Sequence, residues 1–418
     1  MQQEDQGKSK ICPSKSFLPL SAIAAATSAF LGLGGCFSAA SIKPDQPALN
    51  NVSSTPTELS ISQSINIENL LQESWSAYQQ KFIQADGRVI DREDGDRSTS
   101  EAQAYAMLRA VFADDPTTFA RTLNWSENNL QRTDRLWAWE WGLNQGKWGI
   151  IDRNFASDAD IDAITALIFA SRRWQRPEYL QLAQSKLEDL WNLSTVAVPG
   201  GSRYLLPGPK DAFQMRSHLI LNPSYFAPYA FRIFSEVDPA RDWLSLIDTS
   251  YQVLQDSAAL STVNLPSDWV NFDTQTGEYQ ALPASHPLKT EYSFNAYRVW
   301  WRLSWDAVWF REPRATKFLT QHLEYITQLW RTQSRIPAQI GLQGQPLVDY
   351  EATSQYAMLY TAFRVIDPAI ATQMLQQKLL PKYRDGIWEQ DSAYYTQNLV
   401  GLGLLPPTDL KTKLLKPN

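Results

Sequence analysis

Cysteine and histidine are scarce in this chain. Its 418 residues include two cysteines, Cys12 and Cys36, and three histidines. Because both cysteines lie within the first 36 residues, the rest of the chain can form no disulfide framework and offers no thiol nucleophile. Few thiolate and imidazole ligands remain for a zinc or iron site. We therefore expect no metal and no other cofactor.

The chain also lacks an excess of positive charge. It carries 38 Lys and Arg residues against 44 Asp and Glu residues, for a net charge of −6, and has no long basic run. Binding of nucleic acid requires a positive surface, so we expect no nucleic-acid partner. Aromatic residues, in contrast, are abundant, with 16 Trp and 17 Tyr. This composition is compatible with a neutral, ring-shaped ligand such as the sugars of a glucan.

The first 35 residues have the pattern of an export signal. Three lysines precede an apolar run at residues 17–35 that is rich in small side chains. The run ends in Leu-Gly-Gly-Cys at 33–36, which resembles a bacterial lipobox and implies that Cys36 is lipidated. We predict an exported protein, either periplasmic or held at the cell or outer membrane by lipid on Cys36. The alternatives are an ordinary signal peptide cut near residues 39–40 and an uncleaved anchor.

The rest of the chain divides simply. Residues 36–66 are rich in Ser, Pro, Asn, Thr and Gln and predict a flexible tether. A single large domain follows at 67–405, and residues 406–418 form a C-terminal tail. We expect a monomer.

Twelve helical patterns succeed one another along the predicted domain. Residues 102–112 and 163–170 are apolar on nearly every side and must be buried, whereas 177–192 has one polar face and can cover them. An inner ring of helices inside an outer ring fits this alternation, although a bundle or a solenoid fits almost as well. The expected helices span 67–83, 99–113, 116–130, 158–174, 177–192, 223–236, 238–256, 290–306, 313–332, 350–364, 367–378 and 391–402, with a hairpin at 269–279.

Two acidic residues begin buried helices and suggest acid/base chemistry. Glu101 follows Thr-Ser at 99–100, and Asp158 follows Ala-Ser at 156–157. A structural interpretation competes for both, because Ser98 and Glu101 have the spacing of a capping box and acids are favoured at helix N-termini. A calcium loop does not fit, since the required Gly and Glu would fall on Ala163 and Phe169. The spacing alone leaves catalysis and capping open.

An ordered set of motifs across residues 75–310 resembles glycoside hydrolase family 8, in particular the endo-β-1,4-glucanases that accompany bacterial cellulose synthesis. The resemblance implies an all-α (α/α)6 barrel, with six inner and six outer helices and a few short strands in loops. It also implies inverting, internal cleavage of a β-1,4-linked polysaccharide. The motifs are Gly-Arg-Val-Ile-Asp at 87–91, Thr-Ser-Glu-Ala-Gln-Ala-Tyr at 99–105, Trp-Glu-Trp-Gly at 139–142, Ala-Ser-Asp-Ala-Asp at 156–160, Leu-Leu-Pro-Gly at 205–208 and Asn-Pro-Ser-Tyr at 222–225.

The same resemblance implies roles for individual residues. Glu101 corresponds to the general acid, and Asp158 to the acid that binds and distorts the sugar at the cleavage point. The substrate would be a β-glucan, and the cellulose-synthesis machinery would be a possible partner. The predicted substrate-binding residues are Trp139, Trp141, Tyr225, Asn295, Arg298 and Tyr105.

The expected catalytic base is missing. Where the cellulose-associated relatives have Tyr-Asp-Ala-x-Arg, this chain reads Phe-Asn-Ala-Tyr-Arg at 294–298, with Asn295 at the position of the base. An amide cannot accept a proton from water at neutral pH. We therefore predict either an active enzyme with a relocated base or a non-catalytic glucan-binding lipoprotein, and a lipid-anchored scaffold without a sugar ligand is a third interpretation. The candidate bases are Asp306, Glu291, Glu351 and Asp349.

Overall fold

The computed structural model describes residues 66–406 and 414–415. The predicted signal segment, Cys36, the tether up to residue 65 and most of the C-terminal tail lie outside the described residues. Leu414 and Leu415 of the tail are buried, and the Leu414 carbonyl accepts a hydrogen bond of 2.8 Å from Arg172. Within the described part, no helix combines the length and the hydrophobicity needed to cross a bilayer.

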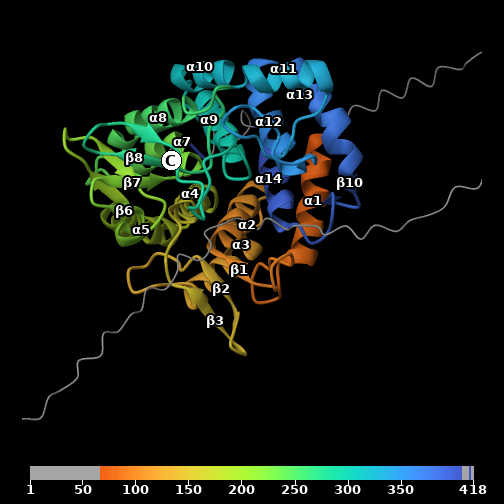
Figure 1. The fold of residues 1–418 in the computed structure, drawn as a ribbon. Helices are drawn as coiled ribbons and strands as arrows, with labels where there is room; N and C mark the ends of the chain where they lie inside the picture. Colours follow the sequence, from red (N-terminus) through yellow and green to blue (C-terminus); the bar gives the residue numbers. More distant parts are fainter. Residues whose placement is uncertain (1–65, 407–413, 416–418) are drawn as a thin grey trace, which may run out of the picture.

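Six helices form a closed inner ring. Each packs against the next, and the last returns to the first (Figure 1). Closure makes the ring a barrel, because no helix is left with an open edge. In ring order the helices are α2 (Ser100–Phe112), α4 (Ser157–Trp174), α7 (Pro228–Val237), α9 (Tyr297–Trp309), α12 (Thr353–Ile366) and α14 (Tyr394–Leu404).

Six further helices cover the ring from outside, and each packs on one inner helix. They alternate with the inner helices along the chain, so the molecule is the expected (α/α)6 barrel. The pairs are α1 (Ile67–Phe82) on α14, α3 (Pro116–Asn129) on α2, α5 (Pro177–Ser194) on α4, α8 (Ser245–Ala258) on α7, α10 (Pro313–His322) on α9 and α13 (Pro368–Met374) on α12. Helix α11 (Glu324–Gln333) follows α10.

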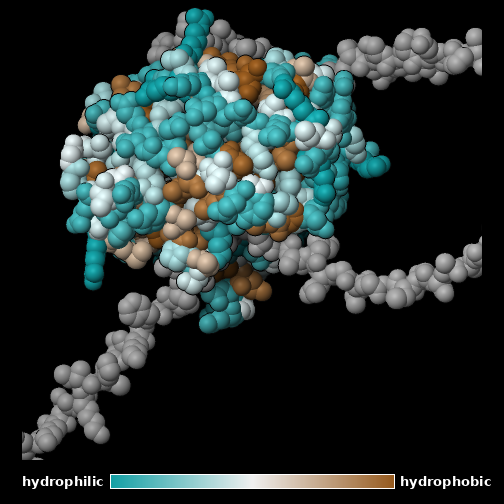
Figure 2. Space-filling view, turned by 45° about the horizontal axis from the view of Figure 1, so that its top comes forward, coloured by the Kyte–Doolittle hydropathy of each residue, from teal (hydrophilic) through white to brown (hydrophobic). Residues whose placement is uncertain are grey.

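The burial of each helix follows its hydrophobic pattern. In α2 every residue from Ala102 to Val111 is buried, and in α4 the first fourteen residues are buried. In α5 only a stripe is buried, at Tyr179, Ala183 and the positions one turn further along. Apolar helices thus form the inner ring and striped helices the outer ring, as predicted. The surface in Figure 2 is mainly hydrophilic, with hydrophobic patches across the middle of the face in view.

Several predicted helices begin too early. Helix 223–236 splits into a 3-10 turn, η1 (Pro223–Tyr225), and α7, because a proline at 228 disfavours helical backbone in the residue before it. The predicted helices 238–256, 290–306 and 350–364 begin at residues 245, 297 and 353 instead. The predicted 313–332 helix is two helices. The segments before α9 and α12 are loops, and they contain residues of the candidate site.

Short antiparallel strands lie in the loops. The predicted hairpin is confirmed as β8 (Val270–Asp273) and β9 (Tyr279–Gln280), which join β6 (Gln214–Met215) and β7 (His218–Leu221) in one sheet. A second sheet, not predicted, contains β1 (Ser98–Thr99), β2 (Glu140–Asn144) and β3 (Lys147–Asp152). Its β2–β3 hairpin projects from the helical body (Figure 1). Two small hairpins, β4–β5 (Thr195–Ala197, Arg203–Leu205) and β10–β11 (Tyr383–Arg384, Ile387–Trp388), complete the strands of the described chain.

Candidate active site

An open cleft of about 810 Å³ lies at the N-terminal ends of the inner helices. Each inner helix contributes lining residues from its first turn or from the loop just before it. The polypeptide therefore brings six distant segments to one end of the barrel. These contributions include Glu101 for α2, Asp158 for α4, Tyr225 before α7, Asn295 and Arg298 for α9, Thr353 for α12 and Tyr394 for α14.

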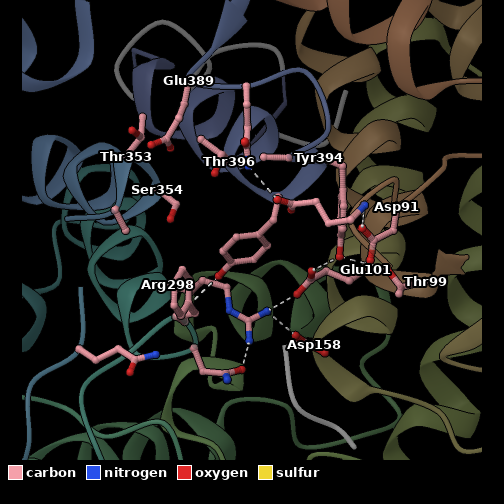
Figure 3. Close-up of a pocket in the computed structure, with 18 of the residues that line it drawn as sticks. Asp91, Thr99, Glu101, Asp158, Arg298, Thr353, Ser354, Glu389, Tyr394 and Thr396 are labelled. Atoms are coloured by element: carbon pink, nitrogen blue, oxygen red, sulfur yellow. Dashed lines mark hydrogen bonds and ion pairs between the residues drawn. The ribbon is translucent and has the colours of Figure 1, made fainter. Parts of the chain in front are cut away.

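Arg298 joins the two predicted catalytic acids. Its Nη1 atom lies 2.6 Å from Oε2 of Glu101 and 2.6 Å from Oδ2 of Asp158, and its Nη2 donates to Oδ1 of Asn295 at 2.7 Å. Figure 3 shows the guanidinium of Arg298 pointing at both acids. Arg298 is buried, so its charge is compensated by these carboxylates and not by water. The structure thus brings together four of the residues predicted from the sequence.

The shared nitrogen limits the distance between the acids. Because Oε2 of Glu101 and Oδ2 of Asp158 both lie 2.6 Å from Arg298 Nη1, they cannot be more than twice that distance apart. The two carboxyl groups of an inverting pair are typically about 6.5–9.5 Å apart, with a water between them. Asp158 therefore does not fit the base of an inverting enzyme. Its position fits an acid that holds the sugar next to Glu101.

The environment of Glu101 favours its protonated form. Burial raises its pKa to about 7; Arg298 opposes this shift, and the neighbouring charge of Asp158 adds to it. The Tyr394 hydroxyl donates to Glu101 Oε1 at 3.3 Å, and the Tyr105 hydroxyl lies 3.5 Å from Oε2. Such a pKa lets a carboxyl hold its proton near neutral pH, as a general acid must.

The capping-box interpretation of Glu101 is wrong. The helix is capped by Thr99, whose Oγ1 accepts from the Ala102 N–H at 3.1 Å. Ser98, the expected cap, instead donates to the Val89 carbonyl at 2.6 Å and accepts from Arg88. Because β1 ends at Thr99 and α2 begins at Ser100, Thr99 and not Ser98 is the last non-helical residue, and the Glu101 carboxylate contacts Arg298.

A buried carboxylate missed by the sequence analysis lies behind Asn295. Asp268 accepts hydrogen bonds from the backbone N–H groups of Ala296 at 2.7 Å and Ser293 at 3.2 Å, and it also hydrogen-bonds the Asn295 side chain. Burial raises its pKa to about 7 against these hydrogen bonds. Oδ1 of Asn295 also accepts from Asn222 at 3.2 Å. No motif marks Asp268; its only sequence signal is its place directly before the predicted hairpin.

The four candidate bases separate into two groups. Asp349 and Glu351 line the cleft, whereas Asp306 and Glu291 do not. Asp306 is fully buried and is held by Arg232 at 2.9 Å and by the Tyr251 hydroxyl. Burial raises the pKa of Glu351, but hydrogen bonds from Lys378 and Tyr356 outweigh it and lower the pKa below its ordinary value. Asp349 is exposed.

The predicted substrate-binding aromatic residues also fall into two groups, those that line the cleft and those that do not. Trp139 and Tyr225 line the cleft, and the indole N–H of Trp139 has no partner among the described residues. Tyr105 does not line the cleft; it supports Glu101 and Arg298 from behind. Trp141 is outside the cleft as well and packs against other tryptophans. Lining residues that we did not predict include Asp91, Glu93, Arg97, Gln339, Tyr350, Thr353, Ser354, Glu389 and Gln390.

Arg97 organises one end of the cleft. It forms ion pairs with Asp91 at 3.1 Å and with Glu140 at 2.9 Å, and its guanidinium lies 5.8 Å from the centre of the Trp139 ring. Metal binding is a separate matter: among the described residues, no group of three or more His, Cys, Asp or Glu side chains has an arrangement that could hold a metal ion.

Comparisons with known proteins show what this chain is similar to. The model of glycosyl hydrolases family 8 matches residues 53–405. An endoglucanase from Xanthomonas axonopodis pv. citri (strain 306) is 38% identical over 207 residues, which is 48% of this chain and 53% of that protein. The chain spans about half to two thirds of the length of the first curated relatives that it matches.

Solved structures match a larger share of this chain than the curated relatives do. An endo-1,4-D-glucanase from Vibrio fischeri ES114 is 26% identical with a TM-score of 0.69, over 79% of this chain and 93% of that one. An endo-β-1,4-glucanase from Acetobacter xylinum is also 26% identical, with a TM-score of 0.66, over 81% of this chain and 97% of that one.

Proposed function

Since this chain belongs to glycosyl hydrolases family 8, we propose that it is an endo-acting hydrolase of a β-1,4-linked glucan with Glu101 as its general acid. The observation that carries the proposal is the Glu101–Arg298–Asp158 group in the cleft, in which Arg298 and Asp158 are buried and Glu101 has a pKa of about 7. The cleft is open and is formed by the first turns of the inner helices and the loops before them, so a polymer can lie across it and be cut internally.

The proposed reaction uses these residues in fixed roles. Glu101 gives its proton to the glycosidic oxygen as that bond breaks, and a water molecule forms the new bond to the anomeric carbon. A base removes the proton of the water, and Glu101 is reprotonated from solvent. Asp158 binds the sugar at the cleavage point. Arg298 holds Asp158 and Glu101 at a constant separation, which limits the reorganisation that the transition state requires.

We propose that the base is one of the two candidates that line the cleft, Asp349 or Glu351. The lowered pKa of Glu351 favours the ionised form that a base requires, and this supports Glu351 as the base. Exposure to water at the cleft surface supports Asp349. The test is azide rescue of the Asp349→Ala and Glu351→Ala variants. Recovery of cleavage in only one of them identifies the base, and recovery in neither contradicts this assignment.

The test of the overall function is loss of viscosity of a soluble cellulose derivative. The full chain should lower the viscosity, and Glu101→Gln should abolish this, since an amide cannot donate the required proton. Glu178→Gln, an exposed site on α5, is the matched control and should behave like the parent. NMR of the first products should show inversion at the anomeric carbon. Retention would instead indicate that Asp158 attacks the sugar directly.

A second candidate function follows from Asn295. A protein that has lost its base but kept an aromatic cleft would bind glucan without cutting it. Binding without cleavage of any cello-, mixed-linkage, xylo- or chito-oligosaccharide would replace the enzyme proposal with this one.

Export and lipidation at Cys36 are also proposals, supported by the residue pattern at 8–36 alone. A Cys36→Ser variant should move from the membrane fraction to the soluble fraction of the producing bacterium. An unchanged distribution would contradict lipidation.

The monomeric state and a role beside cellulose-synthesis machinery likewise stay predictions. Size-exclusion chromatography with light scattering tests the monomeric state. Co-purification from a cellulose-producing cell tests the association with the synthesis machinery.

A further inference from the structure

The β2–β3 hairpin concentrates exposed apolar surface. Of the seven large hydrophobic residues that are exposed in the described chain, three lie in this hairpin: Leu143 at 54%, Trp148 at 50% and Ile151 at 39% exposure. The hairpin extends away from the helical body (Figure 1). Leu143 and Trp148 lie opposite each other on the two strands, and exposed apolar surface of this kind commonly marks an interaction site.

The Trp148 ring packs against other side chains although it is exposed. It stacks on Trp141 with ring centres 5.2 Å apart and an interplanar angle of 20°, and the guanidinium of Arg88 lies 4.6 Å from both ring centres. Trp141 in turn packs edge-to-face on Trp125 at 5.2 Å. A side chain that is already ordered loses little conformational entropy when a ligand binds, which favours binding by its free surface.

The hairpin is continuous with one end of the cleft. Trp139 lines the cleft and directly precedes β2, and Arg97 of the cleft wall forms its 2.9 Å ion pair with Glu140, the first residue of β2. On the other side of the sheet, β1 directly precedes the helix that carries Glu101. A polymer that leaves the cleft past Trp139 therefore meets this hairpin next.

We propose that Trp148 is an accessory binding site on which a sugar ring of a β-glucan chain stacks where that chain extends beyond the cleft. The inference rests on the proposed function. The flat, apolar face of the indole complements the apolar face of a β-linked pyranose ring. The exposed Asn144 and Lys147, which pair across the turn, offer polar atoms to the sugar hydroxyls. A linear polymer fits better than a compact partner, because β2 continues directly from Trp139 of the cleft lining.

The experiment measures binding without cleavage, in the full chain with Glu101→Gln. Native gels that contain a soluble cellulose derivative report polymer affinity as retardation. Trp148→Ala should weaken polymer binding about 2- to 10-fold, the range expected for loss of one aromatic contact, and should weaken cellotetraose binding less. Trp148→Phe should recover most of the affinity, because it keeps a flat ring. Leu244→Ala, equally exposed at 52% but outside the hairpin, is the matched control and should match the parent.

The outcomes separate this inference from the proposed function. Undiminished retardation of Trp148→Ala, together with loss of retardation in Trp139→Ala, would overturn the accessory site and leave the cleft function intact. No retardation of the parent on any glucan would overturn both. If Trp148→Ala instead lowered binding to phosphatidylethanolamine–phosphatidylglycerol vesicles and left polymer binding unchanged, the hairpin would contact lipid and the glucan proposal would be wrong. Circular dichroism of each variant verifies its folding.

Discussion

At Glu101 two opposing influences set the protonation state. Burial favours the neutral acid and the Arg298 guanidinium favours the carboxylate, while Asp158 partly neutralises that guanidinium from its other side. The helix N-terminus at which Glu101 lies also favours the carboxylate. The net result is a pKa of about 7, so the residue can exchange its proton near neutral pH.

The pH dependence of cleavage follows from this value. The reaction needs protonated Glu101, whose fraction falls as the pH rises through about 7, so we expect activity to decline over that interval. The Tyr394 hydrogen bond lowers the pKa of Glu101, and Tyr394→Phe should therefore shift the decline to higher pH. The measurement is the pH profile of kcat/KM. Tyr383→Phe, which removes a hydroxyl bonded to Glu73 at the surface, is the control and should leave the profile in place. A shift to lower pH in Tyr394→Phe would contradict this account.

At the scale of elements, helices α4 and α9 face each other through two parallel ion pairs. Asp158 pairs with Arg298, and one turn further along both helices Asp162 pairs with Arg302. Residues four apart lie on the same face of a helix, so the two pairs are stacked. The Asp162–Arg302 pair is fully buried, and Nη1 of Arg302 donates a hydrogen bond to the Tyr229 hydroxyl at 2.8 Å. We infer that the Asp162–Arg302 pair fixes the distance and orientation between α4 and α9, the two helices that carry Asp158 and Arg298 at the cleft.

Removing one member of the Asp162–Arg302 pair should lower the stability of the protein. Asp162→Ala leaves the Arg302 charge buried without its partner, and we expect the free energy of unfolding to fall by about 3–5 kcal/mol. Urea denaturation measures this. The surface pair between Arg176 and Glu178 provides the control, since Arg176→Ala should cause no measurable change. Equal stability of Asp162→Ala and Arg176→Ala would refute a structural role for the buried pair.

At the scale of the whole molecule, function depends on closure of the ring. Closure brings α14 against α2 and α12, and with it Tyr394 to Glu101. The contact with α12 is close at Gly403, where a Cβ atom would lie 2.6 Å from the Ala357 carbonyl oxygen. A glycine is required at this position because two backbones approach each other there.

A methyl group at Gly403 should loosen this closure. Gly→Ala within a helix normally favours folding by about 1 kcal/mol, but here the clash with backbone should dominate and lower the free energy of unfolding by about 1–3 kcal/mol. The midpoint of urea denaturation measures the change. Gly149→Ala, which meets no atom within 4 Å, is the control and should not destabilise the protein. A Gly403→Ala variant as stable as the parent would show that the ring adjusts at this contact.

The two layers of helices were predictable from local pattern, whereas their closure into a barrel was expected only from the family resemblance. Buried helices such as α2 and α4 have no polar face, and α5 has a single apolar stripe, so their layers follow from local pattern. The late starts of α9 and α12 were missed, because the backbone of the preceding residues is set by contacts with distant segments and not by local pattern. They remain loops because their backbone groups bond to segments distant in the sequence, as in the mutual hydrogen bonds of Tyr292 and Ile340.

The sequence by itself determined the family resemblance, the inner and outer helices, and the presence of Glu101, Asp158, Asn295 and Arg298 in recognisable motifs. Only the tertiary structure decided that one guanidinium joins both acids, that Asp268 supports Asn295, and that Asp306 and Glu291 do not line the cleft while Asp349 and Glu351 do. The physical reason is that distance and burial arise when segments separated in the sequence converge at one end of a closed ring. Local spacing predicts which helix face a side chain occupies, but not which side chain it meets across the barrel.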